Sequence, residues 1–192
     1  MRPEITLAFD TSAAHCAAAL LCGDRVTTRV EVMAKGQAER LVPMLEELLA
    51  AEGVGWPEIS CIAVGVGPGN FTGVRIAVAL ARGLALGLGV PAIGVTGFEA
   101  VGFEAVGAAR TVSIPAPRGR FYVRVPGLAA EIVEVEPEGV VRLAEMPVEA
   151  FVAAIARVGR DKAQVAQPRP APFYLRGADA APASDPPPVI LP

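Results

Sequence analysis

The feature that most constrains this fold is a nearly continuous apolar run over residues 59–66 that leads directly into a glycine-rich loop. Such a run is typical of a strand that is buried on both faces in a parallel sheet. The loop, residues 67–73 with the sequence Gly-Pro-Gly-Asn-Phe-Thr-Gly, joins this strand to a predicted helix over residues 72–88. A short strand over residues 91–95 closes the unit.

Three strands and one helix precede this unit. Residues 5–10 and 15–21 are apolar strands, and residues 25–32 alternate enough to form a third. Because only a short turn separates the second strand from the third, these two must pair antiparallel. A helix is predicted over residues 37–52, where apolar residues recur at helical spacing. Its apolar stripe consists of Leu41, Met44, Leu45, Leu48 and Leu49.

The order meander, helix, strand, helix and strand is that of a ribonuclease-H-like lobe. The predicted fold class is therefore α/β with two lobes, which comprise residues 1–96 and residues 97–192. The second lobe is expected to hold a hairpin over residues 111–125, a second one over residues 132–144, and a helix over residues 148–158.

Composition argues against several classes of protein. Hydrophobic residues make up 53% of the chain and charged residues 19%, which excludes a disordered protein. The longest uncharged runs, residues 59–74 and 83–98, contain proline and glycine and fall short of the roughly 20 apolar residues of a membrane span. Prolines are concentrated beyond Pro168, so this tail is predicted to be mostly extended and partly disordered, except at residues 173–175.

Charge and cysteine content indicate a cytoplasmic protein that does not bind nucleic acid on its own. The net charge is −3 and neither half of the chain is basic, which argues against direct nucleic-acid binding. The N-terminus lacks the pattern of a signal peptide, and three cysteines without metal-ligand spacing are typical of reduced thiols. The only histidine, His15, cannot form a histidine-rich metal site, so a structural or exposed strand position is expected and no metal is predicted.

Two loops have the residue types of an anion site. Asp10, Thr11 and Ser12 follow an apolar strand, where short hydroxyl side chains and backbone N–H groups can cradle a phosphate. The alternative is an ordinary turn that ends the strand.

The second loop, residues 67–73, precedes a helix N-terminus, which attracts anions through its unpaired N–H groups. It lacks the Gly-Lys-Ser/Thr of a Walker A loop. The alternative is a tight strand-to-helix turn in which Thr72 caps the helix and Phe71 anchors it in the core. The residues that would contact an anion are Gly67, Gly69, Asn70 and Thr72.

Three arginines lie close together in the expected first hairpin of the second lobe. Arg118 and Arg120 are at its tip, and Arg124 follows beyond Tyr122. They can contact phosphate or an RNA backbone, which would make the chain a direct RNA-binding module. The alternative is an ordinary solvated hairpin.

Several segments together resemble one protein family. Residues 7–12, 38–45 and 62–76 are similar to the TsaB (YeaZ) family of the threonylcarbamoyladenosine tRNA-modification pathway, and the run Gly-Pro-Gly-Asn-Phe-Thr-Gly-Val-Arg is very specific to it. The resemblance covers residues 5–95 and weakens beyond them, where the landmarks are Arg118-Gly119-x-x-Tyr122 and residues 173–176.

The resemblance implies an actin-like ATPase (ASKHA) fold with two lobes, and the second lobe of this chain is expected to be shorter than is usual in the family. It also implies a non-catalytic activating subunit that dimerises with TsaD, the catalytic paralogue, which transfers threonylcarbamoyl to adenosine 37 of tRNAs reading ANN codons. TsaE, an ATPase, joins the complex, and TsaC makes the activated donor upstream. No cofactor is implied, tRNA is reached only through the partner, and weak nucleotide binding stays open.

In this family the two helices of the first lobe form the dimer surface, with TsaD or with a second copy. TsaD-like relatives bind metal through two histidines on the first of these helices, and residues 37–52 contain none. The predicted partner surface consists of Leu41, Met44, Leu45, Leu48, Val74, Val78 and Ala81. Which helix face points outward stays open at this stage, as does an alternative function as a small ATPase or phosphotransferase suggested by the two loops.

Overall fold

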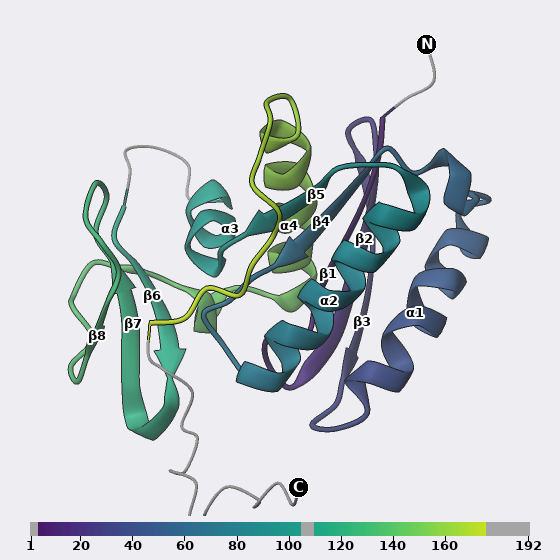
Figure 1. Ribbon diagram of the computed structural model, residues 1–192. Coiled ribbons are helices and arrows are strands. Elements are labelled where there is room, and N and C mark those ends of the chain that lie inside the picture. The colour runs from purple at the N-terminus through teal and green to yellow at the C-terminus, as the bar shows by residue number, and fades with distance from the viewer. Residues whose placement is uncertain (1–3, 105–109, 176–192) are drawn as a thin grey trace, which may run out of the picture.

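The computed structural model describes residues 4–104 and 110–175, and a five-stranded sheet forms its centre (Figure 1). The strand order is β3-β2-β1-β4-β5, in which β1–β2 and β2–β3 pair antiparallel while β1–β4 and β4–β5 pair parallel. This is the predicted meander followed by the predicted parallel unit. The strands are β1 (Ile5–Asp10), β2 (His15–Cys22), β3 (Arg25–Val32), β4 (Cys61–Gly65) and β5 (Ala92–Val95).

Helices cover both faces of this sheet, because its central strands are apolar on both sides. One face carries α1 (Gln37–Ala51) and α2 (Phe71–Leu88), which lie side by side in Figure 1. The opposite face carries α4 (Val148–Lys162), and α3 (Gly97–Glu104) packs against α4. Alternate residues of the strands divide between the two cores, as the two-residue period of a strand requires.

A second, four-stranded sheet has the order β8-β7-β6-β9. The predicted first hairpin is confirmed, with β6 (Val112–Ala116) antiparallel to β7 (Arg120–Arg124). The predicted pairing of residues 132–136 with 140–144 is wrong. Instead, β8 (Glu131–Val133) extends the hairpin beside β7, and β9 (Val141–Arg142) pairs parallel with the far edge of β6.

The expected lobe boundary at residue 96 separates the two sheets but not two packing units. Helix α4 belongs to the second half of the chain, yet it lies across β1, β2 and β4 of the first sheet. Gly159 of α4 packs directly on Ala63 of β4. The core on this side of the sheet therefore contains residues from both halves of the chain.

The described part of the C-terminal segment, which ends at residue 175, returns to the first sheet as an extended chain without helix or strand from residue 168. The Phe173 N–H donates to the Val66 carbonyl at 2.7 Å, and the Phe173 ring packs edge-on against Phe98. Residues 176–192 lie outside the described residues, and so does the prediction of disorder for that part of the tail.

Helix α2 is the one described helix that is long and apolar enough to cross a membrane by length and composition alone. Its inward residues, Val74, Ala77, Val78, Ala81 and Ala85, are buried against the sheet. The expectation that the chain has no membrane span stays a prediction.

The close seat of α4 on the sheet makes Gly159 sensitive to substitution. In Gly159→Ala the added methyl group would overlap the side chain of Ala63, so we expect the free energy of unfolding to fall by about 2 kcal/mol in urea titrations. The matched control is Gly83→Ala on α2, where an added methyl group meets nothing within 4 Å. This control should stabilise the helix by up to about 1 kcal/mol. Equal effects of the two substitutions would contradict the packing.

A half-buried ion pair joins α3 to α4 and makes the stability of the fold depend on pH. Glu99 accepts hydrogen bonds from the Thr96 N–H and hydroxyl at 2.7 Å and from Lys162 Nζ at 2.8 Å. Burial raises the pKa of Glu99, but the hydrogen bonds from Lys162 and Thr96 outweigh it and hold that pKa below its usual range.

The pKa of Glu99 is lower in the folded state than in the unfolded state. The contribution of Glu99 to the free energy of unfolding is therefore fully present above the unfolded-state pKa of about 4.3, and it is lost as pH falls through the folded-state pKa. We expect Glu99→Gln to lower the free energy of unfolding at neutral pH by about 1–2 kcal/mol. The loss should shrink in urea titrations at decreasing pH. A loss that stays constant down to acidic pH would contradict this role of the carboxylate.

Candidate functional site

The two predicted anion loops meet at one edge of the central sheet. Strands β1 and β4 are parallel, so the turn after β1 and the loop after β4 emerge at the same end. The Asn70 N–H donates to the Ser12 carbonyl at 2.6 Å, and the Thr11 hydroxyl donates to the Gly73 carbonyl at 2.7 Å. The sequence singled out both loops separately, and the structure brings them together so that they bond to one another.

Three glycines permit this contact. A Cβ atom on Gly65 would overlap the Asp10 carboxylate, one on Gly69 would overlap the Ser12 carbonyl, and one on Gly73 would overlap the Thr11 carbonyl. Any other residue at these positions would push the turn away from the loop. We call this arrangement the glycine seat, meaning residues 10–12 resting on Gly65, Gly69 and Gly73.

The Asp10 carboxylate is buried in the glycine seat and takes three donors on one oxygen. Asp10 Oδ1 accepts from the Ser12 N–H at 3.0 Å and from the Ser12 hydroxyl at 2.8 Å, and His15 Nε2 lies 2.8 Å away. Asp10 Oδ2 faces Gly65 and has no hydrogen-bond partner among the described residues.

His15 is buried and pairs with Asp10, which agrees with the expected structural role. Sequence reasoning missed this partnership, although a signal for it exists. Strands β1 and β2 pair with Asp10 opposite Ala17, so the start of β2 lies beside the end of β1. Adopting that hairpin register from the sequence would have placed His15 near the carboxylate.

The chemistry of the glycine seat favours a structural turn over a phosphate cradle. The hydroxyls of Thr11 and Ser12 and the N–H groups of Ser12, Asn70 and Gly73 all donate within the seat. The buried carboxylate of Asp10 would also repel an anion placed among them. The geometry therefore favours the two alternatives of a strand-ending turn and a tight strand-to-helix turn, and nucleotide binding stays an untested prediction.

The start of α2 differs from the expectation in two details. Asn70, in the extended region, is the N-cap, and its side-chain oxygen accepts from the Gly73 N–H at 2.9 Å. In the tight-turn alternative Thr72 was to cap the helix, and this detail is wrong, because Thr72 already lies inside the first turn. Phe71 is half-buried and stacks on Tyr174 at 5.0 Å between ring centroids, so it does not anchor in the core.

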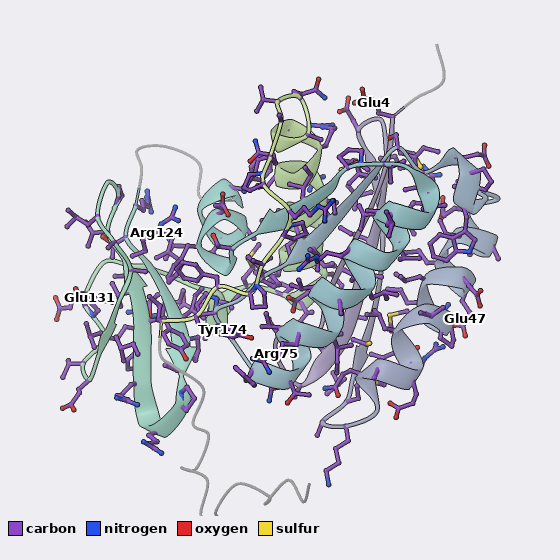
Figure 2. All side chains as sticks on the ribbon, viewed as in Figure 1. Glu4, Glu47, Arg75, Arg124, Glu131 and Tyr174 are labelled. Carbon is purple, nitrogen blue, oxygen red and sulfur yellow. The ribbon has the colours of Figure 1, made fainter. Side chains whose placement is uncertain are left out.

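Arg75 completes this contact with the C-terminal segment. Its guanidinium lies 3.7 Å above the Phe71 ring, and its Nε donates to the Tyr174 hydroxyl at 3.0 Å. Figure 2 labels Arg75 and Tyr174, which approach each other from α2 and from the C-terminal segment. Sequence reasoning could not find this pair, because the two residues are 99 positions apart.

The seven residues predicted for the partner surface all lie on the inward faces of α1 and α2. Side chains that are buried against the sheet of their own chain cannot contact a partner, so this assignment of faces is corrected. Whether a partner covers the outward faces stays a prediction. The buried residues are Leu41, Met44, Leu45, Leu48, Val74, Val78 and Ala81.

The three hairpin arginines have different surroundings. Arg118 is exposed in the turn between β6 and β7, whereas the Arg124 guanidinium lies 5.5 Å from the centroid of the Phe98 ring. The Nε atom of Arg120 is buried without a hydrogen-bond partner in the described part of the chain. The structure therefore favours a packed hairpin over an arginine patch.

Two of the three cysteines are buried thiols. Burial raises the pKa of the Cys16 and Cys61 thiols to about 11, so neither is a thiolate at neutral pH. Within residues 4–104 and 110–175, His, Cys, Asp and Glu form no group of three that could hold a metal ion.

Comparisons with known proteins agree on one family. The family model "TsaD: tRNA N6-adenosine threonylcarbamoyltransferase" matches residues 27–168. The TsaB protein of Escherichia coli K12 is 40% identical over 90 residues, which cover 47% of this chain and 39% of the relative. The TsaB protein of Haemophilus influenzae is 39% identical over 94 residues, which cover 49% and 40%. The matched segment thus spans about two fifths of either relative.

A solved structure extends the similarity to most of the chain. YeaZ from Pseudomonas aeruginosa superposes with a TM-score of 0.68 at 26% identity, covering 84% of this chain and 94% of that one. Together with the sheet order, this match confirms the predicted α/β fold class of the actin-like type.

The corrected helix cap gives a direct test of the local geometry. Because the Asn70 side chain satisfies the Gly73 N–H, Asn70→Ala should lower the free energy of unfolding by about 1 kcal/mol in urea titrations. The matched control, Thr72→Ala, should change it by less than about 0.5 kcal/mol, since Thr72 is exposed within the helix. A larger loss for Thr72→Ala than for Asn70→Ala would restore the original assignment.

Proposed function

Because the chain belongs to the TsaD family and is a member of its TsaB (YeaZ) type, we propose that it is a non-catalytic activating subunit in tRNA threonylcarbamoylation. In this proposal it dimerises with TsaD, which transfers threonylcarbamoyl to adenosine 37 of tRNAs reading ANN codons. TsaE joins the pair, and TsaC supplies the donor. The chain is cytoplasmic, needs no cofactor and reaches tRNA through its partner.

The observation that carries the proposal is the closed glycine seat. In an ATPase of this fold class, the turn after β1 and the loop after β4 would have to offer donors to a phosphate. Here the Thr11 and Ser12 hydroxyls and the Asn70 and Gly73 N–H groups bond within the protein. Because these donors are already bonded within the protein, they support a subunit that acts by binding a partner protein.

The outward side of α2 is the surface best suited to a partner. Ala79, Gly83 and Gly87 are exposed four residues apart, and a Cβ atom on either glycine would meet nothing within 4 Å. Ile76 and Leu80, both half-buried, complete the stripe. We call these five residues the outer α2 face.

Small residues on the outer α2 face let another backbone approach closely. Helices pack at a distance set by the side chains at the contact, so a stripe of alanine and glycine allows the shortest separation. Helix α1 lies beside α2 on the same side of the sheet, as Figure 1 shows, and can widen the contact. We therefore place the interface with TsaD on this face, opposite the buried residues first assigned to it.

The proposal predicts that tRNA modification requires both the chain and the outer α2 face. In a reaction reconstituted from TsaC, TsaD, TsaE and tRNA, adding the chain should increase formation of threonylcarbamoyladenosine. Gly83→Arg should lower that activity by about tenfold or more, because a long side chain at the centre of a close contact prevents packing. The modified nucleoside is measured by mass spectrometry of digested tRNA.

The matched control is Gly83→Ala, which should keep most of the activity because one methyl group protrudes little. Both variants should fold, since position 83 has open space around it. Equal modification with and without the chain would refute the activating role. Full activity of Gly83→Arg would refute the assigned face and leave the role intact.

A further inference from the structure

A groove of about 740 Å³ lies away from the glycine seat, on the flank of α2. It runs between the C-terminal half of α2, the start of β5 and residues 163–170, the segment after α4 that Figure 1 draws in yellow-green beside the sheet. The side chains that give it its chemistry are Arg82, Leu86, Val90, Ile93, Val165 and Arg169.

The groove carries uncompensated positive charge. Arg82 and Arg169 both line it, and no carboxylate does. Neither guanidinium forms an ion pair with the described residues, whereas Arg25, Arg40 and Arg142 all pair with glutamates. Two unpaired guanidinium groups at one groove attract a ligand that brings carboxylates or other anionic groups.

The same groove exposes aliphatic surface. Leu86 is 83% exposed and Val165 is 65% exposed, and both line the groove together with the half-buried Val90. A single exposed aliphatic residue is ordinary, but two of them flanking one arginine-lined groove suit an apolar side chain placed between them. Because these flanks are open to solvent, they would not enclose a small molecule as ligand pockets do.

The end of α2 adds hydrogen-bond acceptors to the groove. The N–H groups of Gly89 and Val90 both donate to the Ala85 carbonyl, so the later carbonyls of the last turn keep free acceptor capacity. The negative end of the helix dipole disfavours a purely anionic ligand such as phosphate. A polypeptide fits better, because it offers backbone N–H donors as well as carboxylates.

We propose that this groove binds an acidic, aliphatic segment of a partner polypeptide. Its carboxylates pair with Arg82 and Arg169, an aliphatic side chain lies between Leu86 and Val165, and its backbone N–H groups meet the end of α2. This contact lies on the flank of α2 and borders the outer α2 face at Gly83, which belongs to both surfaces. It goes beyond the proposed function, because it does not require the partner to be TsaD.

The test uses the full chain and a fluorescein-labelled hexapeptide of alternating glutamate and leucine. Fluorescence anisotropy at low salt should show saturable binding that weakens as salt is added. Arg82→Glu and Arg169→Glu should each weaken binding by about tenfold, because each replaces an attraction by a repulsion. The matched control, Arg118→Glu in the exposed β6–β7 turn, makes the same charge change and should leave the affinity unchanged.

Three results would overturn the proposal. The first is no saturable binding at millimolar protein. The second is loss of the charge dependence. Either a peptide with glutamine in place of glutamate binds as tightly as the original peptide, or Arg82→Glu and Arg169→Glu bind the original peptide as tightly as the unsubstituted chain does. The folding of both variants is checked by urea titration. The third is tighter binding of oligouridylate than of the peptide, which would assign the groove to nucleic acid. Each result is independent of whether the chain activates tRNA modification.

Discussion

The glycine seat is the contact on which the rest of the structure depends. With no side chain at Gly65, Gly69 and Gly73, the turn after β1 rests directly on the loop after β4. The backbone and side-chain hydrogen bonds across it fix where α2 begins, and α2 in turn covers the sheet with its inward alanines and valines. The buried Asp10 carboxylate is tolerated because Ser12 and His15 surround it with donors.

The fold class and most elements follow from the sequence because the local patterns are strong. The stripe of Leu41, Met44 and Leu45 has helical spacing, and residues 61–65 are apolar throughout. Contacts between elements that are far apart in the sequence were harder to predict. Helix α4 returns to the first sheet through the seat of Gly159 on Ala63, and no local pattern encodes that meeting.

The candidate site was only partly predictable for related reasons. The two loops were found from their residue types, whereas their meeting depends on the parallel pairing of β1 with β4, which was not predicted. The faces of α2 were not assigned, because alanine, valine and glycine occur all around this helix and a hydrophobic pattern cannot distinguish inward from outward. The Arg75–Tyr174 contact depends on the path of the C-terminal segment, which periodicity does not describe.

Helix α2 therefore presents three different surfaces. One is buried on the sheet, the outer α2 face is small and open, and the flank with Arg82 and Leu86 lines a charged groove. In this chain the donors of the two candidate anion loops bond within the protein, while two sides of α2 are open to solvent. Such a chain is suited to binding other proteins. The central claim is that the chain acts by forming a dimer with TsaD. Its most direct test is the molar mass, measured by light scattering, of the chain mixed with TsaD. The account predicts one species with the summed mass of the two proteins, and two separate species at micromolar concentration would contradict it.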